Sequence, residues 1–315
     1  MSITVRNLTK LYGEEKAIDD ISFDVKTGEI LGFLGPNGAG KTTTMKIITC
    51  YMPPSAGTVT VDDLDVASRS LEVRRKIGYL PELNPLYLDM NVLEYLEYSA
   101  QLHKMTKPQI RQRMREMVDV CGLSDVRHKD IGELSKGYRQ RVGLAQAMIH
   151  DPEVLILDEP TSGLDPNQIV EIRNLIRKLG SAKTVILSTH ILSEVQATCD
   201  RVIIINDGKI VADGTPDHLQ NEFRGSDIIS LELKADVANG MTDIFPKIKA
   251  LPNVENVQYQ NPSPGLHRLI INAAKGSDIR EALFRQAVSE KWLLLEIHRE
   301  ATSLEEVFHK LTTVN

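Results

Sequence analysis

The chain has 315 residues, of which 42% are hydrophobic and 25% charged, and its formal net charge is −6. This length predicts two domains, and the acidic balance disfavours general attraction to nucleic acid phosphates. No stretch approaches about 20 consecutive apolar residues, and residues 1–6 read as the start of a strand, so we expect neither a membrane span nor a secretory signal.

Strands separated by turns are predicted at residues 3–8, 21–25 and 30–34. Tyr12 precedes Gly13 in the first turn region. An aromatic ring there could stack on a nucleotide base, although a half-buried structural aromatic is the more ordinary interpretation of a single tyrosine. The three cysteines, Cys50, Cys121 and Cys199, lack metal-ligand spacing and indicate reduced, structural thiols of a cytosolic protein.

The strand at 30–34 leads into a segment that fits the phosphate-loop pattern G-x-x-x-x-G-K-[ST] at every fixed position. The segment consists of Gly35, Pro36, Asn37, Gly38, Ala39, Gly40, Lys41 and Thr42, and Thr43 begins a helix predicted over 43–49. Glycines let the backbone N–H groups point at phosphate oxygens, and the helix N-terminus adds partial positive charge. Lys41 would reach the β- and γ-phosphates, and the Thr42 hydroxyl would bind Mg²⁺. A glycine-rich turn that binds nothing is the disfavoured alternative.

Residues 84–134 read as a helical insertion within an α/β domain. A strand is predicted at 58–61, and another runs from 77 into a loop at Glu82. Asn91 and Glu94 form a predicted capping box that opens a helix over 92–103. An amphipathic helix follows over 106–121, and we interpret its arginines as a solvated face.

The α/β pattern then resumes with helices at 141–149 and 168–179. The apolar run 154–157 is typical of a strand buried on both faces of a parallel sheet, and further strands are predicted at 184–187, 202–205 and 209–212. Lys41, Asp158 and His190 follow such strands, so we expect them to converge at the carboxyl edge of a mostly parallel sheet.

Two carboxylates come directly after the strand at 154–157. Asp158 is placed to hold Mg²⁺ opposite the phosphate loop, and Glu159 could polarise a water for attack on the γ-phosphate. Paired carboxylates are common on surfaces, but this context favours the functional interpretation. His190, taken alone, is more typical of a structural histidine.

A polar linker is predicted at 220–226, and the pattern beyond it changes. Strands at 228–233, 254–259, 268–271 and 293–297, helices at 244–251 and 278–290 and a turn at 261–265 predict a split ferredoxin-like arrangement with no catalytic constellation. A last helix over 303–312 opens with a Ser303 and Glu306 capping box. Its apolar stripe could equally pack on its own domain or dock a partner.

Three further segments carry a family resemblance. The run 134–141 (LSKGYRQR) resembles the signature loop of ATP-binding cassette (ABC) ATPases, 155–165 (LILDEPTSGLD) their second nucleotide motif and D-loop, and Ser188-Thr189-His190 their switch histidine. The resemblance covers residues 2–220. It implies a P-loop cassette at 1–220 with a mixed or parallel sheet, an antiparallel β subdomain and a helical subdomain at about 84–150. It also implies adenine stacking for Tyr12 and γ-phosphate sensing for His190.

The same resemblance implies a head-to-tail dimer, most simply a homodimer, around two ATP and Mg²⁺. Ser135 and the Gly137 N–H of one subunit would contact the γ-phosphate bound by the other, with Asp165 in the adjoining D-loop. The partner that the dimer drives would be a separate integral membrane permease. The chain would then be cytoplasmic and peripheral on the inner face of the membrane, without direct contact to cargo or nucleic acid.

Two positions depart from the family pattern. Lys136 and Tyr138 replace the middle (third-position) Gly and the Gln of the usual Leu-Ser-Gly-Gly-Gln, whereas the two contact residues, Ser135 and Gly137, are kept. Glu82 stands where the family usually has a glutamine that touches Mg²⁺ or water and senses the permease. A carboxylate can still bind Mg²⁺, but it brings negative charge near the γ-phosphate.

Among exporter cassettes, the chain resembles most closely the gliding-motility-associated (GldA-type) subunits. The resemblance lies in residues 79–87, in the signature loop that begins at Leu134 and in residues 303–308. Residues 226–315 would then be a small accessory or dimerisation domain. A non-transport ABC ATPase acting on nucleic acid or ribosomes is the alternative, disfavoured because there is one cassette, no long coiled-coil insertion and negative charge. A catalytically dead scaffold is disfavoured because Lys41, Asp158, Glu159 and His190 are all present.

Overall fold

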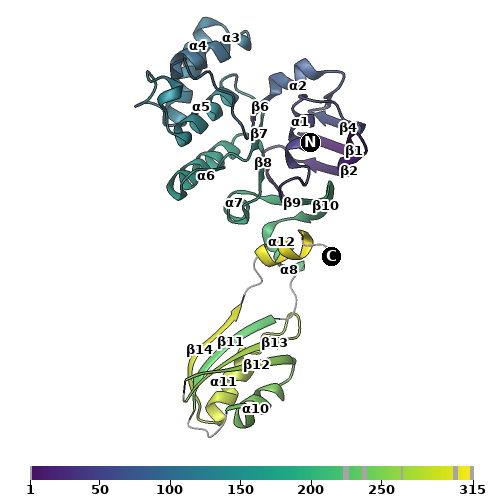
Figure 1. Cartoon of the computed structure of the whole chain (residues 1–315), viewed down its shortest axis with the longest axis vertical. Helices are drawn as coiled ribbons and strands as arrows, with labels where there is room; N and C mark the ends of the chain where they lie inside the picture. Colours follow the sequence, from purple (N-terminus) through teal and green to yellow (C-terminus); the bar gives the residue numbers. More distant parts are fainter. Residues whose placement is uncertain (1, 223–226, 236–239, 264, 301–303, 313–315) are drawn as a thin grey trace. The chain divides into compact units, whose positions relative to one another are not determined.

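The computed structural model describes residues 2–222, 227–235, 240–263, 265–300 and 304–312 (Figure 1). It divides into two compact units: the first comprises the chain up to Pro216 together with the residues from Lys310 onward, and the second comprises Asp217–His309. Each unit has its own hydrophobic core.

The first unit is built on a six-stranded sheet with the strand order β10-β9-β3-β8-β7-β6. All neighbours are parallel except β9 and β10, which form a hairpin. The central strands are buried along their whole length, which confirms the prediction from their unbroken apolar runs. The six strands are β3 (Ile30–Leu34), β6 (Ile77–Leu80), β7 (Val154–Asp158), β8 (Thr184–Thr189), β9 (Arg201–Asn206) and β10 (Lys209–Gly214).

An antiparallel sheet with the order β2-β1-β4-β5 packs over the same core. Its strands are β1 (Ile3–Tyr12), β2 (Glu15–Val25), β4 (Ala56–Val61) and β5 (Leu64–Asp65). β1 and β2 are longer than predicted, and Tyr12 ends a strand rather than lying in a turn. Register shifts interrupt the pairing of β1 with β2, and Asn7 has a positive φ of 48°. These irregularities break the period-two alternation by which a strand is recognised.

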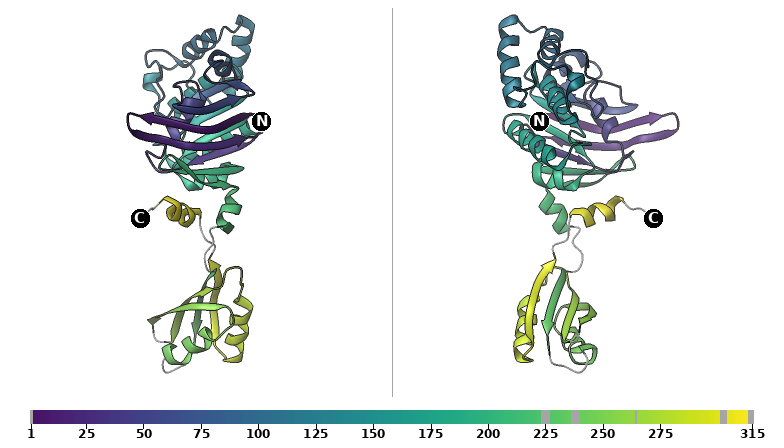
Figure 2. Two further views of the ribbon diagram at one scale, coloured as in Figure 1. Left: turned by 90° about the vertical axis from the view of Figure 1, so that its right-hand side faces the viewer. Right: turned by 60° about the vertical axis from the view of Figure 1, so that its left-hand side comes forward.

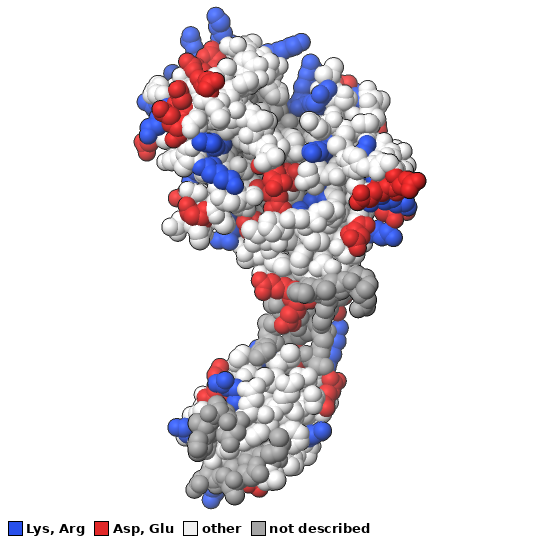
Figure 3. Space-filling view, in the orientation of Figure 1, with Lys and Arg blue, Asp and Glu red and all other residues white. Residues whose placement is uncertain are grey.

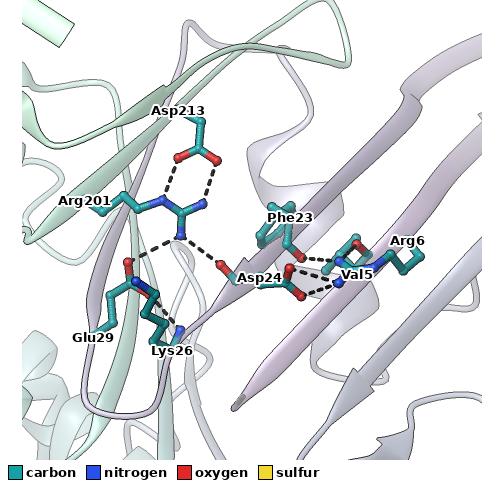
Figure 4. Close-up of polar contacts among 8 residues, drawn as sticks. All are labelled: Val5, Arg6, Phe23, Asp24, Lys26, Glu29, Arg201 and Asp213. Atoms are coloured by element: carbon teal, nitrogen blue, oxygen red, sulfur yellow. Dashed lines mark hydrogen bonds and ion pairs between the residues drawn. The ribbon is translucent and has the colours of Figure 1, made fainter. Parts of the chain in front are cut away.

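One arginine ties the two sheets together. The Arg201 guanidinium at the start of β9 donates to the Asp213 carboxylate on β10, to the Asp24 backbone carbonyl on β2 and to Glu29 (Figure 4). The Asp24 carboxylate in turn accepts from Arg6 on β1. The polar network therefore connects strands that lie nearly 200 residues apart in the chain.

The helices of the first unit cover the sheets, and those of the insertion lie together at one end (Figures 1 and 2). The capping box of Asn91 and Glu94 is confirmed at the start of α3. The helix expected at 141 begins at Lys136, because Ser135 caps it and Gly137 is helical. The helices are α1 (Lys41–Ile48), α2 (Ser70–Lys76), α3 (Val92–Leu102), α4 (Lys107–Val120), α5 (Lys136–Met148), α6 (Pro166–Gly180) and α7 (Leu192–Thr198).

The second unit contains an antiparallel sheet with the order β12-β13-β11-β14. In chain order its elements are β11 (Asp227–Lys234), α9 (Gly240–Asp243), α10 (Phe245–Lys249), β12 (Val254–Ser263), β13 (Leu266–Ala273), α11 (Arg280–Ser289) and β14 (Leu293–Glu300). The turn predicted at 261–265 is wrong for 261–263, which continue β12.

Two helices lie where the chain passes between the two units. α8 (Pro216–Glu222) takes up the first residues of the predicted linker at 220–226, and the rest of that linker lies outside the described residues. The predicted last helix is present as α12 (Leu304–Thr312), whereas Ser303 of its capping box also lies outside the described residues.

Candidate functional site

The phosphate loop lies between β3 and α1, as its pattern requires. Gly40 caps α1 with a φ of 107°, and a Cβ there would stand 2.5 Å from the Ala17 carbonyl oxygen. Gly38 also has a positive φ, of 83°. Glycine is needed at both turns, and the backbone that results leaves the N-terminal N–H groups of α1 available to an anion.

Lys41 is buried and folds back over this loop. Its Nζ donates to the carbonyl oxygens of Gly35 at 2.8 Å and Pro36 at 3.2 Å. The same ammonium lies 3.5 Å from Oε1 of Glu159, which is also buried. An ammonium held by these oxygens is placed to exchange them for the more negative oxygens of a phosphate.

Asp158 ends β7 and is fully buried. Its Oδ1 accepts from the Thr42 hydroxyl at 3.2 Å and from the Ser188 hydroxyl. Oδ2 is buried without a hydrogen-bond partner among the described residues. Burial raises the pKa of the Asp158 carboxyl, and the two hydroxyls oppose that rise. A divalent cation would satisfy the free oxygen and favour the charged carboxylate.

Glu159 follows in the left-handed region, with a φ of 49°. Its backbone N–H donates to the Ser188 carbonyl at 3.1 Å, and this contact holds the turn. Oε2 of Glu159 lies 2.9 Å from Nδ1 of the half-exposed His190. A non-glycine residue with positive φ is uncommon, and here it aims the carboxylate between an ammonium and an imidazole.

These side chains surround a hollow of about 360 Å³ at the carboxyl edge of the six-stranded sheet. Lys41 and His190 line it as predicted, whereas Asp158 does not line it and is connected to it through the Thr42 hydroxyl. Our sequence reasoning did not name Ser162 or Ser188 as site residues. Ser188 pairs in register with Asp158, so its place at the end of the neighbouring strand was the available signal. The lining residues are Asn37, Gly38, Gly40, Lys41, Thr42, Thr43, Glu82, Glu159, Ser162 and His190.

Eight of the predicted site residues do not line this hollow; Gly35, Pro36 and Ala39 belong to the phosphate loop, Asp158 accepts a hydrogen bond from Thr42, and the other four lie elsewhere in the chain. Tyr12 is half exposed at the end of β1, where its hydroxyl contacts the Met52 sulfur. Ser135 caps α5, and Asp165 caps α6 by accepting from the Gln168 N–H at 2.9 Å. Gly137 is buried, and a Cβ on it would stand 2.7 Å from the Gln168 side chain. Within one chain, the signature segment therefore packs against α6 rather than reaching the phosphate loop.

A second hollow of about 480 Å³ adjoins the first, and Thr42 and Glu82 line both. Its walls are mostly apolar and aromatic, with Tyr51, Tyr79 and Tyr95 among them. The Tyr79 hydroxyl is buried without a partner among the described residues, and burial raises its pKa. Glu82 thus links the polar hollow to an apolar one.

The donor set fits Mg²⁺ rather than a metal held by protein alone. Within the described ranges, no group of three or more His, Cys, Asp or Glu side chains could hold a metal ion. Mg²⁺ typically takes one or two carboxylates together with phosphate oxygens and water. The Thr42 hydroxyl and the Asp158 carboxylate supply protein ligands of that kind. None of the described helices combines the length and hydropathy needed to cross a membrane.

Comparison with known proteins gives consistent matches. The ABC transporter family model matches residues 18–162. The uncharacterized ABC transporter ATP-binding protein YxlF of Bacillus subtilis is 32% identical over 98% of this chain and 99% of its own length. The linearmycin resistance ATP-binding protein LnrL of the same organism is 31% identical over 98% of both chains. The dimeric post-hydrolysis structure of the cassette MJ0796 bound to ADP and Pi has a TM-score of 0.62, with 28% identity, and covers 68% of this chain and 98% of that one.

Proposed function

This chain belongs to the ATP-binding proteins of ABC transporters, and from that premise we propose how its own residues bind and cleave ATP. It is an ATPase subunit of an exporter-type system, in a family that works as dimers with a membrane permease. The observation that carries the residue assignment is the meeting of Lys41, Glu159 and His190 at one hollow beside the phosphate loop.

ATP binds with its phosphates in the loop of residues 35–43. Lys41 leaves the Gly35 and Pro36 carbonyls for the β- and γ-phosphates, and Tyr12 stacks on the adenine. The Thr42 hydroxyl and Asp158 would hold Mg²⁺, with Glu82 as a further oxygen donor that lines the same hollow as Thr42. The ion supplies neutralisation of the phosphate charge when it is bound.

Glu159 is the general base of hydrolysis. Its carboxylate is buried and fixed from both sides, by Lys41 at 3.5 Å and His190 at 2.9 Å. Once Lys41 turns to the phosphates, one carboxylate oxygen is free to accept a proton from the attacking water. His190 is then the residue that contacts the γ-phosphate and reports whether it is present.

The remaining site residues act across a head-to-tail dimer, which is most simply a homodimer. Ser135 is exposed and lies at the N-terminus of α5, where the helix dipole favours an anion. We assign Ser135, the Gly137 N–H and Asp165 to the ATP bound by the partner copy. That assignment accounts for their absence from the hollow of their own chain.

The apolar hollow beside Glu82 is the permease contact in this proposal. The tyrosines and the leucine of this hollow offer an apolar surface to the permease. Glu82 lies beside them and also lines the hollow of the phosphate loop, so a movement of the permease is transmitted to the nucleotide site through Glu82. The subunit is then cytoplasmic and peripheral on the inner face of the membrane. Its cargo contacts belong to the permease.

The domain assignment is a cassette at 1–220 and an accessory or dimerisation domain at 226–315. Two observations support a ferredoxin-like fold for the accessory domain. Its elements follow the order strand–helix–strand twice, and its sheet has the strand order β12-β13-β11-β14. The gliding-motility subgroup stays a prediction from the sequence. Because the chain is similar over its full length to a linearmycin resistance protein, export of a drug is a second candidate role beside gliding motility.

The test is a gentle detergent purification of the tagged Glu159→Gln protein from its native cells, with mass spectrometry of what accompanies it. A stoichiometric multi-span membrane protein is expected, because a closed ATP-bound dimer should stay on its permease. Ribosomal or DNA-repair proteins without a membrane chain would replace the transport assignment by the non-transport alternative, and would leave the ATPase assignment standing.

A further inference from the structure

A hollow of about 870 Å³ runs along the helical insertion, on a different side of α3 from the apolar hollow beside Glu82. We call it the α3–α4 groove. None of its lining residues lines either hollow at the nucleotide site. The α3–α4 groove is lined by Leu93, Glu97, Gln101, Met105, Lys107, Ile110, Arg111, Met114, Arg115, Val118, Asp119, Ser124 and Arg127.

The floor of this groove is an apolar stripe on α4. Ile110, Met114 and Val118 follow one another at intervals of four residues, so they lie on one face of the helix over successive turns. Leu93 of α3 and Met105 complete the floor. The apolar stripe is about two turns long, or roughly 12 Å from residue 110 to 118 at ~1.5 Å per residue.

A cationic stripe runs beside the apolar one. Lys107, Arg111 and Arg115 are exposed and again spaced by four residues. Over the described part of the chain none of them has an ion-pair partner, whereas Arg113, on another side of the same helix, pairs with Glu116 and Asp151. Lys and Arg side chains project at the top of the molecule over α3 and α4 (Figure 3).

The charge balance of the lining is positive. Arg127 adds a fourth cation after α4, against the two carboxylates Glu97 and Asp119. Four cations against two carboxylates along an apolar groove indicate a surface that complements acidic groups.

We propose that the α3–α4 groove binds an acidic amphipathic helix of a partner protein. The two parallel stripes with a four-residue period match a helix that carries apolar side chains on one face and Asp or Glu beside them. An extended peptide has a two-residue period and would not follow both stripes. Burial of the apolar face supplies affinity, and the cations select acidic helices over basic ones.

The first test uses a synthetic helical peptide of about 18 residues with leucines on one face and glutamates flanking them. Its binding to the full-length protein is measured by fluorescence anisotropy, and a control peptide has lysines in place of the glutamates. We expect binding of the acidic peptide only, weakening as salt is raised. Failure of the acidic peptide to bind, or equal binding of the lysine peptide, would overturn the proposal.

A matched pair of charge reversals locates the binding. Arg111→Glu with Arg115→Glu should weaken binding of the acidic peptide about tenfold, since each reversal replaces an attraction by a repulsion. The control is Arg173→Glu with Arg177→Glu on α6, which has the same spacing and the same change in net charge. If both double variants weakened peptide binding equally, the peptide would bind elsewhere and the proposed binding role of the α3–α4 groove would be wrong.

The natural occupant is identified by a photoreactive amino acid placed at Gln101, an exposed residue of the groove wall. A crosslinked segment in native cells that is helical in pattern and acidic supports the proposal. A basic or extended segment contradicts it. Binding of dodecyl phosphate vesicles or micelles that depends on Arg111 and Arg115, together with no peptide binding, would reassign the groove to an anionic lipid.

Discussion

At the scale of single residues, the catalytic proposal depends on one carboxylate. Glu159 follows Asp158 directly, yet the two carboxylates have different surroundings. Asp158 accepts from two hydroxyls and keeps one free buried oxygen, which suits a metal ligand. Glu159 turns into the left-handed region and faces Lys41 and His190, which suits a base. The positive φ at Glu159 is what separates their roles.

Glu159→Gln should therefore bind ATP but hydrolyse it about 10²- to 10⁴-fold more slowly, because the amide cannot accept the proton. Steady-state phosphate release and equilibrium binding of a fluorescent ATP analogue measure the two effects separately. Glu72→Gln is the control, since it removes only an exposed pair with Arg69. Parental turnover in the Glu159 variant would exclude this residue as the base.

At the scale of elements, a pair of stacked histidines joins the helical insertion to the edge of the sheet. His103 ends α3, and His150 follows α5; their rings are 3.7 Å apart and nearly parallel. A ring nitrogen of His150 lies 3.2 Å from the Ile77 carbonyl at the start of β6, and its Nδ1 is buried without a partner in the described residues. Burial and the neighbouring His103, Lys183 and Arg113 lower the pKa of His150 to about 4, against a usual 6.5.

This arrangement predicts a loss of stability in acid. Between about pH 6.5 and 4 the unfolded chain takes up a proton that the folded His150 refuses, so stability falls as the pH is lowered through that window. The loss amounts to ~3–4 kcal/mol at most, from about 1.4 kcal/mol for each pKa unit between the usual 6.5 and about 4. Burial also lowers the pKa of His103, which acts in the same direction.

Urea unfolding followed by circular dichroism at about pH 7.5 and pH 5 measures the effect. His150→Gln should be less stable at neutral pH, because the ring packing is lost, but should show a clearly smaller difference between the two pH values. The exposed His128→Gln should keep the full difference. An unchanged pH difference in His150→Gln would show that another group causes the acid sensitivity.

At the scale of the whole molecule, each unit buries its own core, so the second unit is an addition to a complete cassette. The second unit also exposes large apolar side chains. Phe284 and Val288 of α11 and Leu293 and Leu295 of the edge strand β14 are each between 45% and 61% exposed. Exposed apolar side chains next to an unpaired strand edge favour association with another chain.

We therefore expect a truncation after Gly225, made with Glu159→Gln, to dimerise with ATP about tenfold more weakly than the full-length variant, as the second unit adds contact area. Analytical ultracentrifugation with and without ATP measures both dissociation constants. Retained ATP binding by the truncated protein controls for folding of the cassette. Equal dimerisation of the two proteins would remove the dimerisation role of the second unit.

The sequence by itself determined the nucleotide chemistry, because a phosphate loop is a local conformation that its glycines, Lys41 and Thr42 specify. It also determined the buried parallel strands, since an unbroken apolar run has few other stable environments. Sequence periodicity gave wrong element bounds where the backbone is irregular. β1 and β2 continue through bulges that interrupt the alternation of apolar residues. α5 begins at Lys136, earlier than predicted, because Ser135 caps it and Gly137, a residue that disfavours helices, is part of its first turn.

Only the tertiary structure decided which distant side chains meet. Ser188 joins Asp158 across two strands, His103 stacks on His150, and Gly137 packs against α6 instead of the phosphate loop of its own chain. The α3–α4 groove likewise depends on how two helices pack and which cations that packing leaves unpaired. Periodicity fixes the face on which a residue lies, whereas contacts between separated segments follow from the packing of the whole unit.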